Sequence, residues 1–228
     1  MEQNQIRKIT FIDSVDLLKN ISQQAEYQIN WSESRKIITC LDAHQGKVFD
    51  LKLPLAFPKS DGIDSLSTYL EQLPEVPKDY LILLIQAGNA ALAYIADGKI
   101  ESHKVIRKYM IRAKQGKAQL GHLKTKGKSK AGSRVRLAQT ILFFEEINEK
   151  LQEWEVENTN QIFFSASIQI WNLLFESKIK PPFEKKDARL IKIPKDLPIP
   201  NFELLVKVNQ FLQTAYLRAY QDLEDKFM

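Results

Sequence analysis

The fold is decided by residues 80–112, which read YLILLIQAGNAALAYIADGKIESHKVIRKYMIR. The stretch contains three strand-forming runs, at 80–86, 90–96 and 99–112. Turn signals separate them, first at Gly88-Asn89 and then at Asp97-Gly98. An Asp-Gly pair between two β-rich runs is typical of a tight hairpin turn. The stretch therefore predicts three consecutive antiparallel strands.

The residues that follow predict helices alternating with single strands. Residues 134–154 carry apolar side chains at three- and four-residue spacing, which predicts a long amphipathic helix: Leu137, Ile141, Phe144, Ile147, Leu151 and Trp154. Further on, the patterns predict a strand at 161–165, a helix at 167–178, a strand at 189–193 and a helix at 202–225. The order indicates an α/β fold with a mixed sheet (α+β), as in RNase H-like folds. Such sheets host nucleases, kinases and binding domains, so the fold alone gives no activity.

The residues before the three strands predict a smaller region. Runs at 36–41 and 47–53 flank His44-Gln45-Gly46 and predict a hairpin, and 65–73 predicts a short helix. We expect an N-terminal extension at 1–75, a main domain at 76–195 with a basic loop at 113–133, and a C-terminal helix within 196–228 that packs on the core.

The charge distribution narrows the classes of partner. The 228 residues sum to +5, but residues 104–136 contain 12 Lys or Arg and no Asp or Glu. Such a segment repels itself unless a polyanion offsets it, and nucleic acid is the favoured polyanion. An anionic membrane is the alternative, but these cations flank Gly, Ser and Thr and do not form one face of a helix.

Composition excludes several other classes. The longest apolar run, 90–96, has seven residues, against roughly 18 needed to span a bilayer. The single Cys40 excludes an internal disulfide and fits a reducing cytoplasm, and the three histidines are too scattered to suggest a metal cluster. We therefore expect a cytoplasmic, monomeric protein without cofactor, metal or membrane contact.

Two motifs flank the lysine-rich part of the basic segment. The first is Arg112-Ala113-Lys114-Gln115-Gly116-Lys117-Ala118-Gln119, and the second is Ser129-Lys130-Ala131-Gly132-Ser133-Arg134-Val135-Arg136. Their order, their spacing and their strand-loop-helix context resemble those of the Vms-one-like release factors. This is a peptidyl-tRNA hydrolase family of ribosome quality control, related to the middle domain of eukaryotic and archaeal peptide-release factors. The resemblance covers about residues 80–193.

The resemblance implies a ribosome-rescue peptidyl-tRNA hydrolase, which frees the nascent peptide by ester hydrolysis or by cleaving the tRNA near its 3′ end. Gln119 would act in the peptidyl-transferase centre of the large subunit, with Gly116 keeping the loop slender. Partners would be the ribosome, peptidyl-tRNA and rRNA. The expected RNA-binding residues are Arg112, Lys114, Lys117, Lys124, Lys126, Lys128, Lys130, Arg134 and Arg136. Release factors proper have Gly-Gly where this chain has Lys117-Ala118, which favours the quality-control branch.

Physical chemistry agrees with a neutral catalytic side chain. No carboxylate lies between Lys104 and Phe144, so hydrolysis would depend on positioning and on stabilising the oxyanion. His122 is a less favoured candidate base. A non-catalytic RNA-binding module is the main alternative. A metal nuclease is a weaker one, because Asp97 and Glu101 are the only acids near the central strands.

Overall fold

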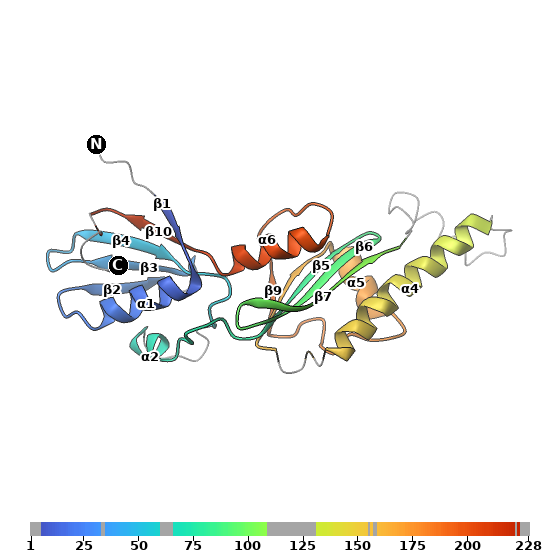
Figure 1. Ribbon diagram of the computed structural model, residues 1–228, viewed down its shortest axis with the longest axis horizontal. Coiled ribbons are helices and arrows are strands. Elements are labelled where there is room, and N and C mark those ends of the chain that lie inside the picture. Colours follow the sequence, from blue (N-terminus) through green and yellow to red (C-terminus); the bar gives the residue numbers. More distant parts are fainter. Residues whose placement is uncertain are drawn as a thin grey trace. The chain divides into compact units, whose positions relative to one another are not determined.

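The structure, a computed structural model, describes residues 6–32, 35–59, 66–108, 131–154, 156, 159–221 and 223 (Figure 1). For residues 131–137 the description is limited to the helical backbone. The chain divides into two compact units, one formed by residues 1–78 with 208–228 and the other by residues 79–207. No helix in the described ranges is long and apolar enough to cross a membrane. The expected boundaries at 75 and 195 stay a prediction.

The 79–207 unit is built on a mixed five-stranded sheet. Its strands are β5 (Tyr80–Gln86), β6 (Asn89–Ala96), β7 (Lys99–Arg107), β8 (Gln161–Ser165) and β9 (Leu190–Lys192), in the spatial order β7-β6-β5-β8-β9. The first three are antiparallel neighbours, whereas β8 runs parallel to β5 and β9 parallel to β8. The predicted order of strands and helices, and with it the mixed α+β class, is confirmed.

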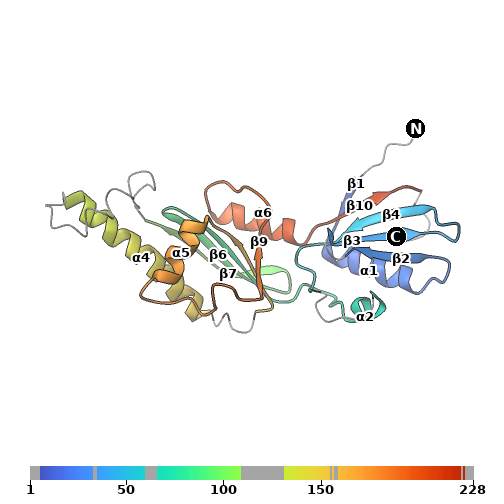
Figure 2. The same cartoon turned by 180° about the vertical axis from the view of Figure 1, so that it is seen from behind.

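Two helices of this unit are α4 (Ala131–Glu153) and α5 (Ile168–Glu176). The core between helices and sheet includes Leu83 of β5, Phe143 and Ile147 of α4, and Leu174 of α5, all fully buried. Ile141, one of the apolar residues whose spacing predicted the amphipathic helix, is 49% exposed. The N-terminal part of α4 extends past the ends of β6 and β7, and among the described residues no strand lies against it there (Figures 1 and 2).

The C-terminal part differs from the single helix expected at 202–225. The helix α6 covers Phe202–Leu212 and is followed by a strand, β10 (Ala215–Ala219). Within β10 the burial alternates, with Ala215 and Leu217 buried and Tyr216 and Arg218 less so. A two-residue period over five residues identifies a strand. The sequence pattern does not predict this strand, because it directly follows a helical pattern.

The strand β10 joins the sheet of the 1–78 and 208–228 unit. Its other strands are β1 (Ile6–Ile9), β2 (Gln28–Ser32), β3 (Ile37–Leu41) and β4 (Lys47–Lys52), in the order β1-β10-β4-β3-β2, all antiparallel. The β3–β4 pair confirms the predicted hairpin, and α2 (Leu66–Glu71) confirms the predicted short helix. The helix α1 (Phe11–Ser22) buries Phe11, Val15 and Leu18. Its N-terminus is closed by reciprocal hydrogen bonds between Thr10 and Asp13.

Candidate nucleic-acid interface

The sequence-predicted site is described only in part. Gln119 and Gly116 lie outside the described residues, as do the candidate RNA-binding residues Arg112, Lys114, Lys117, Lys124, Lys126, Lys128 and Lys130. Arg134 and Arg136 lie in the first turns of α4, where the backbone is described. The structure therefore describes the base of this segment, formed by the end of β7 and the body of α4.

The end of β7 lies at the carboxyl edge of the sheet. Because β5 and β7 both pair antiparallel with β6, they run in the same direction, and β8 and β9 run with them. The backbone amide of Lys108 donates a 2.9 Å hydrogen bond to the carbonyl of Gly88, which continues the β6–β7 pairing beyond Arg107. Gly88 adopts φ 78°, a left-handed value that favours glycine. This bond fixes where the chain leaves the sheet.

Two lysines at this edge share one carboxylate. The Nζ atoms of Lys104 and Lys108 lie 3.3 and 2.9 Å from the carboxylate oxygens of Glu146 on α4. Burial alone would raise the pKa of Glu146, but hydrogen bonds and charge from Lys108 and Lys104 outweigh it, so its pKa lies below the ordinary value. Sequence reasoning missed Glu146. It is one of the first two acids after the acid-free stretch, but its pairing depends on α4 returning across β7.

The beginning of α4 supplies positive potential of its own. The helix starts at Ala131, three residues before the predicted start, and has no acidic residue in its first turn. Unpaired backbone N–H groups at a helix N-terminus attract anions. Arg134 and Arg136 occupy the same turns, and their binding of phosphate stays a prediction.

A buried amide fixes the position of α4 along its axis. The Asn148 side chain is fully buried, and its Nδ2 donates to the carbonyls of Leu174 and Ile179 at 3.0 and 2.7 Å. Gln152, one turn later, donates to the carbonyl of Lys180 at 2.8 Å. These bonds tie α4 to the end of α5 and the residues that follow it. A shift of α4 would break them, so they help to hold its N-terminal turns in place.

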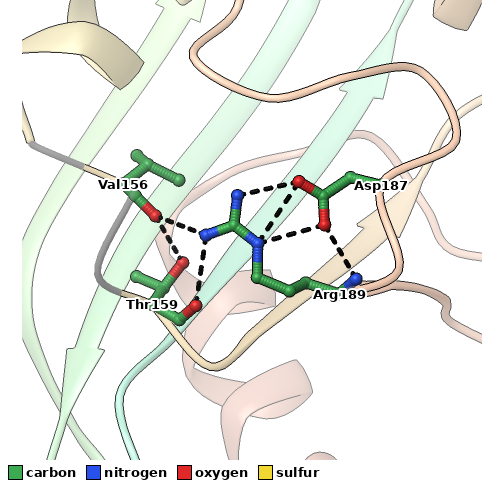
Figure 3. Close-up of polar contacts among 4 residues, drawn as sticks. All are labelled: Val156, Thr159, Asp187 and Arg189. Carbon is green, nitrogen blue, oxygen red and sulfur yellow. Dashed lines mark hydrogen bonds and ion pairs between the residues drawn. The ribbon is translucent and has the colours of Figure 1, made fainter.

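An arginine clamp holds the connection between α4 and β8 (Figure 3). The guanidinium of Arg189 binds the carboxylate of Asp187 through Nε and through Nη2, the latter at 2.8 Å. Its Nη1 donates to the carbonyls of Val156 and Thr159 at 3.0 and 3.2 Å. Because its donors are engaged within the protein, Arg189 is a structural cation and is not a candidate for RNA.

Asp97, one of the two acids considered for metal chemistry, lies in the turn between β6 and β7. Asp97 and Gly98 have φ values of 48° and 75°, as the predicted tight turn requires. Within the ranges that the structure describes, no group of three or more His, Cys, Asp or Glu side chains is placed to hold a metal ion.

By fold and site, this chain falls into the class of release factors: its sheet ends in a cationic connection to a long helix, and a release-factor family model matches residues 80–220. It belongs to the family described as the Bacteroidetes VLRF1 release factor. The family predicted from the two motifs is confirmed.

Curated relatives carry names that refer to tRNA cleavage. The chain is 27% identical over 148 residues to "tRNA endonuclease ANKZF1" of Bos taurus, a match that covers 63% of this chain and 20% of that protein. It is 30% identical over 141 residues to "tRNA endonuclease vms-1" of Caenorhabditis elegans, covering 60% and 22%. The chain thus spans about a fifth of the length of these relatives. A solved structure titled "Vms1 mitochondrial localization core" aligns with 13% identity and a TM-score of 0.43, covering 90% of this chain and 81% of that one.

Proposed function

We propose that this protein acts in ribosome rescue in the cytoplasm, where it frees nascent peptides from tRNA on stalled ribosomes or large subunits through Gln119. The observation that carries the proposal is the release-factor family match across 80–220, within which the motif ending in Gln119 follows β7. In a release factor, the residues of this motif, between β7 and α4, would carry out the reaction.

Charge supports a ribosomal RNA environment for this segment. Of the 12 cations in 104–136, Lys104 and Lys108 are partly neutralised by Glu146 at the base of the segment. Apart from Arg107 of β7, the remaining cations follow that base, up to and including Arg134 and Arg136 in the first turns of α4. Each phosphate that they contact releases counterions, so binding to ribosomes will weaken steeply with salt.

The proposed chemistry uses an amide in place of an ionisable base. The Gln119 side chain both donates and accepts hydrogen bonds, so it can orient a water molecule toward the ester carbonyl. Water attacks that carbon, the bond to the tRNA 3′ oxygen breaks, and the departing oxygen takes a proton from the water. Glu146, one of the first two acids along α4, is already bound to two lysines. Positioning and oxyanion stabilisation would then supply the rate enhancement.

A second activity is favoured by the names of the relatives. Proteins that share 27–30% identity with this chain are called tRNA endonucleases. The same segment would then cleave a phosphodiester near the tRNA 3′ end, which also liberates the peptide. The two activities differ in the RNA product, since hydrolysis leaves the 3′ end intact and cleavage shortens it.

The test adds purified protein to stalled ribosome–peptidyl-tRNA complexes and measures both free peptide and the tRNA 3′ end. Gln119→Ala is expected to slow release by about 10²- to 10³-fold, the usual cost of losing one transition-state donor. Its sedimentation with ribosomes should be unchanged. Gln139→Ala on α4 is the matched control and should release peptide at the wild-type rate. Equal release by the wild type and Gln119→Ala would overturn the assignment, and absence of release by either would identify a non-catalytic binding module.

A further inference from the structure

The sheet of the 1–78 and 208–228 unit has one buried face and one open face. Ile38, Cys40, Phe49 and Leu51 are fully buried on the face that meets the core. Most of their neighbours along the strands project to the other side and are more exposed, except Val48 next to Phe49, which is 2% exposed. The register places two cross-strand rows on this open face: Lys8, Tyr216, Lys52 and Ile37 in one, and Ile6, Arg218, Asp50, Thr39 and Asn30 in the other.

The open face carries cations without acidic partners. Lys8, Lys52 and Arg218 are all exposed, and within the described residues none of them forms an ion pair. The acid in these two rows, Asp50, is already engaged. Its carboxylate accepts hydrogen bonds from Thr39 and Tyr220, both at 2.6 Å, and pairs with Lys47 at 3.3 Å. The face therefore presents uncompensated positive charge.

An aromatic ring lies in the middle of these cations. Tyr216 is directly opposite Lys8 on one side and Lys52 on the other, because β10 lies between β1 and β4 (Figure 1). Neighbouring strands are about 4.8 Å apart, so the two lysines flank the ring closely. Arg218 lies two residues further along β10, roughly 6.7 Å from Tyr216 along the strand. The ring is half-buried, which leaves part of it open to a ligand.

We propose that this open face binds single-stranded RNA, with Tyr216 stacking on a base and Lys8, Lys52 and Arg218 binding the flanking phosphates. Stacking on an aromatic ring with cations beside it is how proteins hold unpaired nucleotides on a sheet. A sheet face does not offer the amphipathic helix with which proteins enter an anionic membrane surface. The site goes beyond the proposed function, since it lies in the other unit and uses neither Gln119 nor peptidyl-tRNA.

The test measures fluorescence anisotropy of a labelled 12-nucleotide oligo(U) RNA with the full chain. All proteins carry Lys124→Gln, Lys126→Gln, Lys128→Gln and Lys130→Gln, which removes four of the 12 cations of residues 104–136 and so reduces the contribution of the basic segment. In this background Tyr216→Ala should raise Kd at least about fivefold, and Tyr216→Phe should stay within about twofold because it keeps the stacking surface. Replacing Lys8, Lys52 and Arg218 together by Gln should reduce the slope of log K against log salt by about 2.

A matched triple variant distinguishes binding at a specific site from a general effect of the protein's net charge. Lys99→Gln, Lys185→Gln and Lys186→Gln remove the same charge from exposed positions of the other unit and should leave the slope unchanged. Equal slopes for the two triple variants would overturn the proposal, as would a Tyr216→Phe protein as weak as Tyr216→Ala. If the variant that lacks Lys8, Lys52 and Arg218 no longer pelleted with phosphatidylserine vesicles but kept its RNA affinity, the open face would instead be a membrane-binding surface. Because the assay contains no ribosome, its outcome is independent of the Gln119 test.

Discussion

Replacing Glu146 by Gln removes the carboxylate that two lysines share at the base of the basic segment. The pairs span 2.9 and 3.3 Å, and the side chains of Glu146, Lys108 and Lys104 are 32%, 27% and 42% exposed. Partly exposed pairs contribute about 0.2–1 kcal/mol each, so the loss should total about 1 kcal/mol. For a chain of this length that corresponds to a fall in Tm of about 2–4 °C.

The pH dependence of this effect has a definite sign. The folded-state pKa of Glu146 lies below its ordinary value of 4.5, so the carboxylate stabilises the folded state above that pH. As pH falls through the folded-state pKa, the stabilisation is lost, and the wild type and Glu146→Gln should converge. Differential scanning fluorimetry at pH 7 and in steps below pH 4.5 measures this convergence. Salt should also reduce the difference at pH 7.

The same substitution should strengthen RNA binding. Lys104 and Lys108 no longer share a protein carboxylate and become available to phosphates, so the slope of log K against log salt should steepen by about 1. Glu149→Gln is the matched control, with the same charge change on an exposed side chain of α4. If Glu146→Gln equals Glu149→Gln in both Tm and RNA affinity, the pairing has no energetic role and the reasoning is refuted.

Two further predictions concern buried side chains, one in each unit. Asn148→Ala should lower the free energy of unfolding by about 1–2 kcal/mol in urea titrations, because two carbonyls lose their donor while the unpaired Oδ1 also disappears; Gln152→Ala, at an exposed position, should cost less than about 0.5 kcal/mol. Cys40 should resist thiol reagents at pH 8 and react only on unfolding. It is fully buried, and burial, with a smaller effect from the charge of Asp42, raises its pKa to about 11. Rapid labelling of folded protein would contradict this.

Sequence alone predicts the elements that local signals specify. The hairpins around Gly88-Asn89 and Asp97-Gly98 follow from turn chemistry, and the body of α4 follows from its apolar spacing. The exposure of Ile141 does not follow, because the spacing cannot tell where the supporting sheet ends. The alternation within β10 is short and directly follows a helical pattern, and the partners that define the strand lie more than 150 residues earlier in the chain.

The helix α1 is a different case, since its signals are present in the sequence. Thr10 and Asp13 form a capping box, and Phe11, Val15 and Leu18 follow at helical spacing. For the candidate site, the motif indicates the family, which is confirmed, and predicts Gln119, which lies outside the described residues. The pairing of Glu146 with Lys104 and Lys108 depends on how α4 packs against β7. Residue type thus indicates the chemistry, and tertiary packing decides which cations are already paired with a carboxylate of the protein.

The position of β10 has a consequence for synthesis on the ribosome. The 79–207 unit is continuous in sequence and can fold as soon as it emerges, but the other sheet lacks an inner strand until residues 215–219 arrive. Until then β1 has no partner and β4 has an open edge. The sheet stays incomplete while more than half of the chain is translated. During that time its two unpaired edges can associate with other strands.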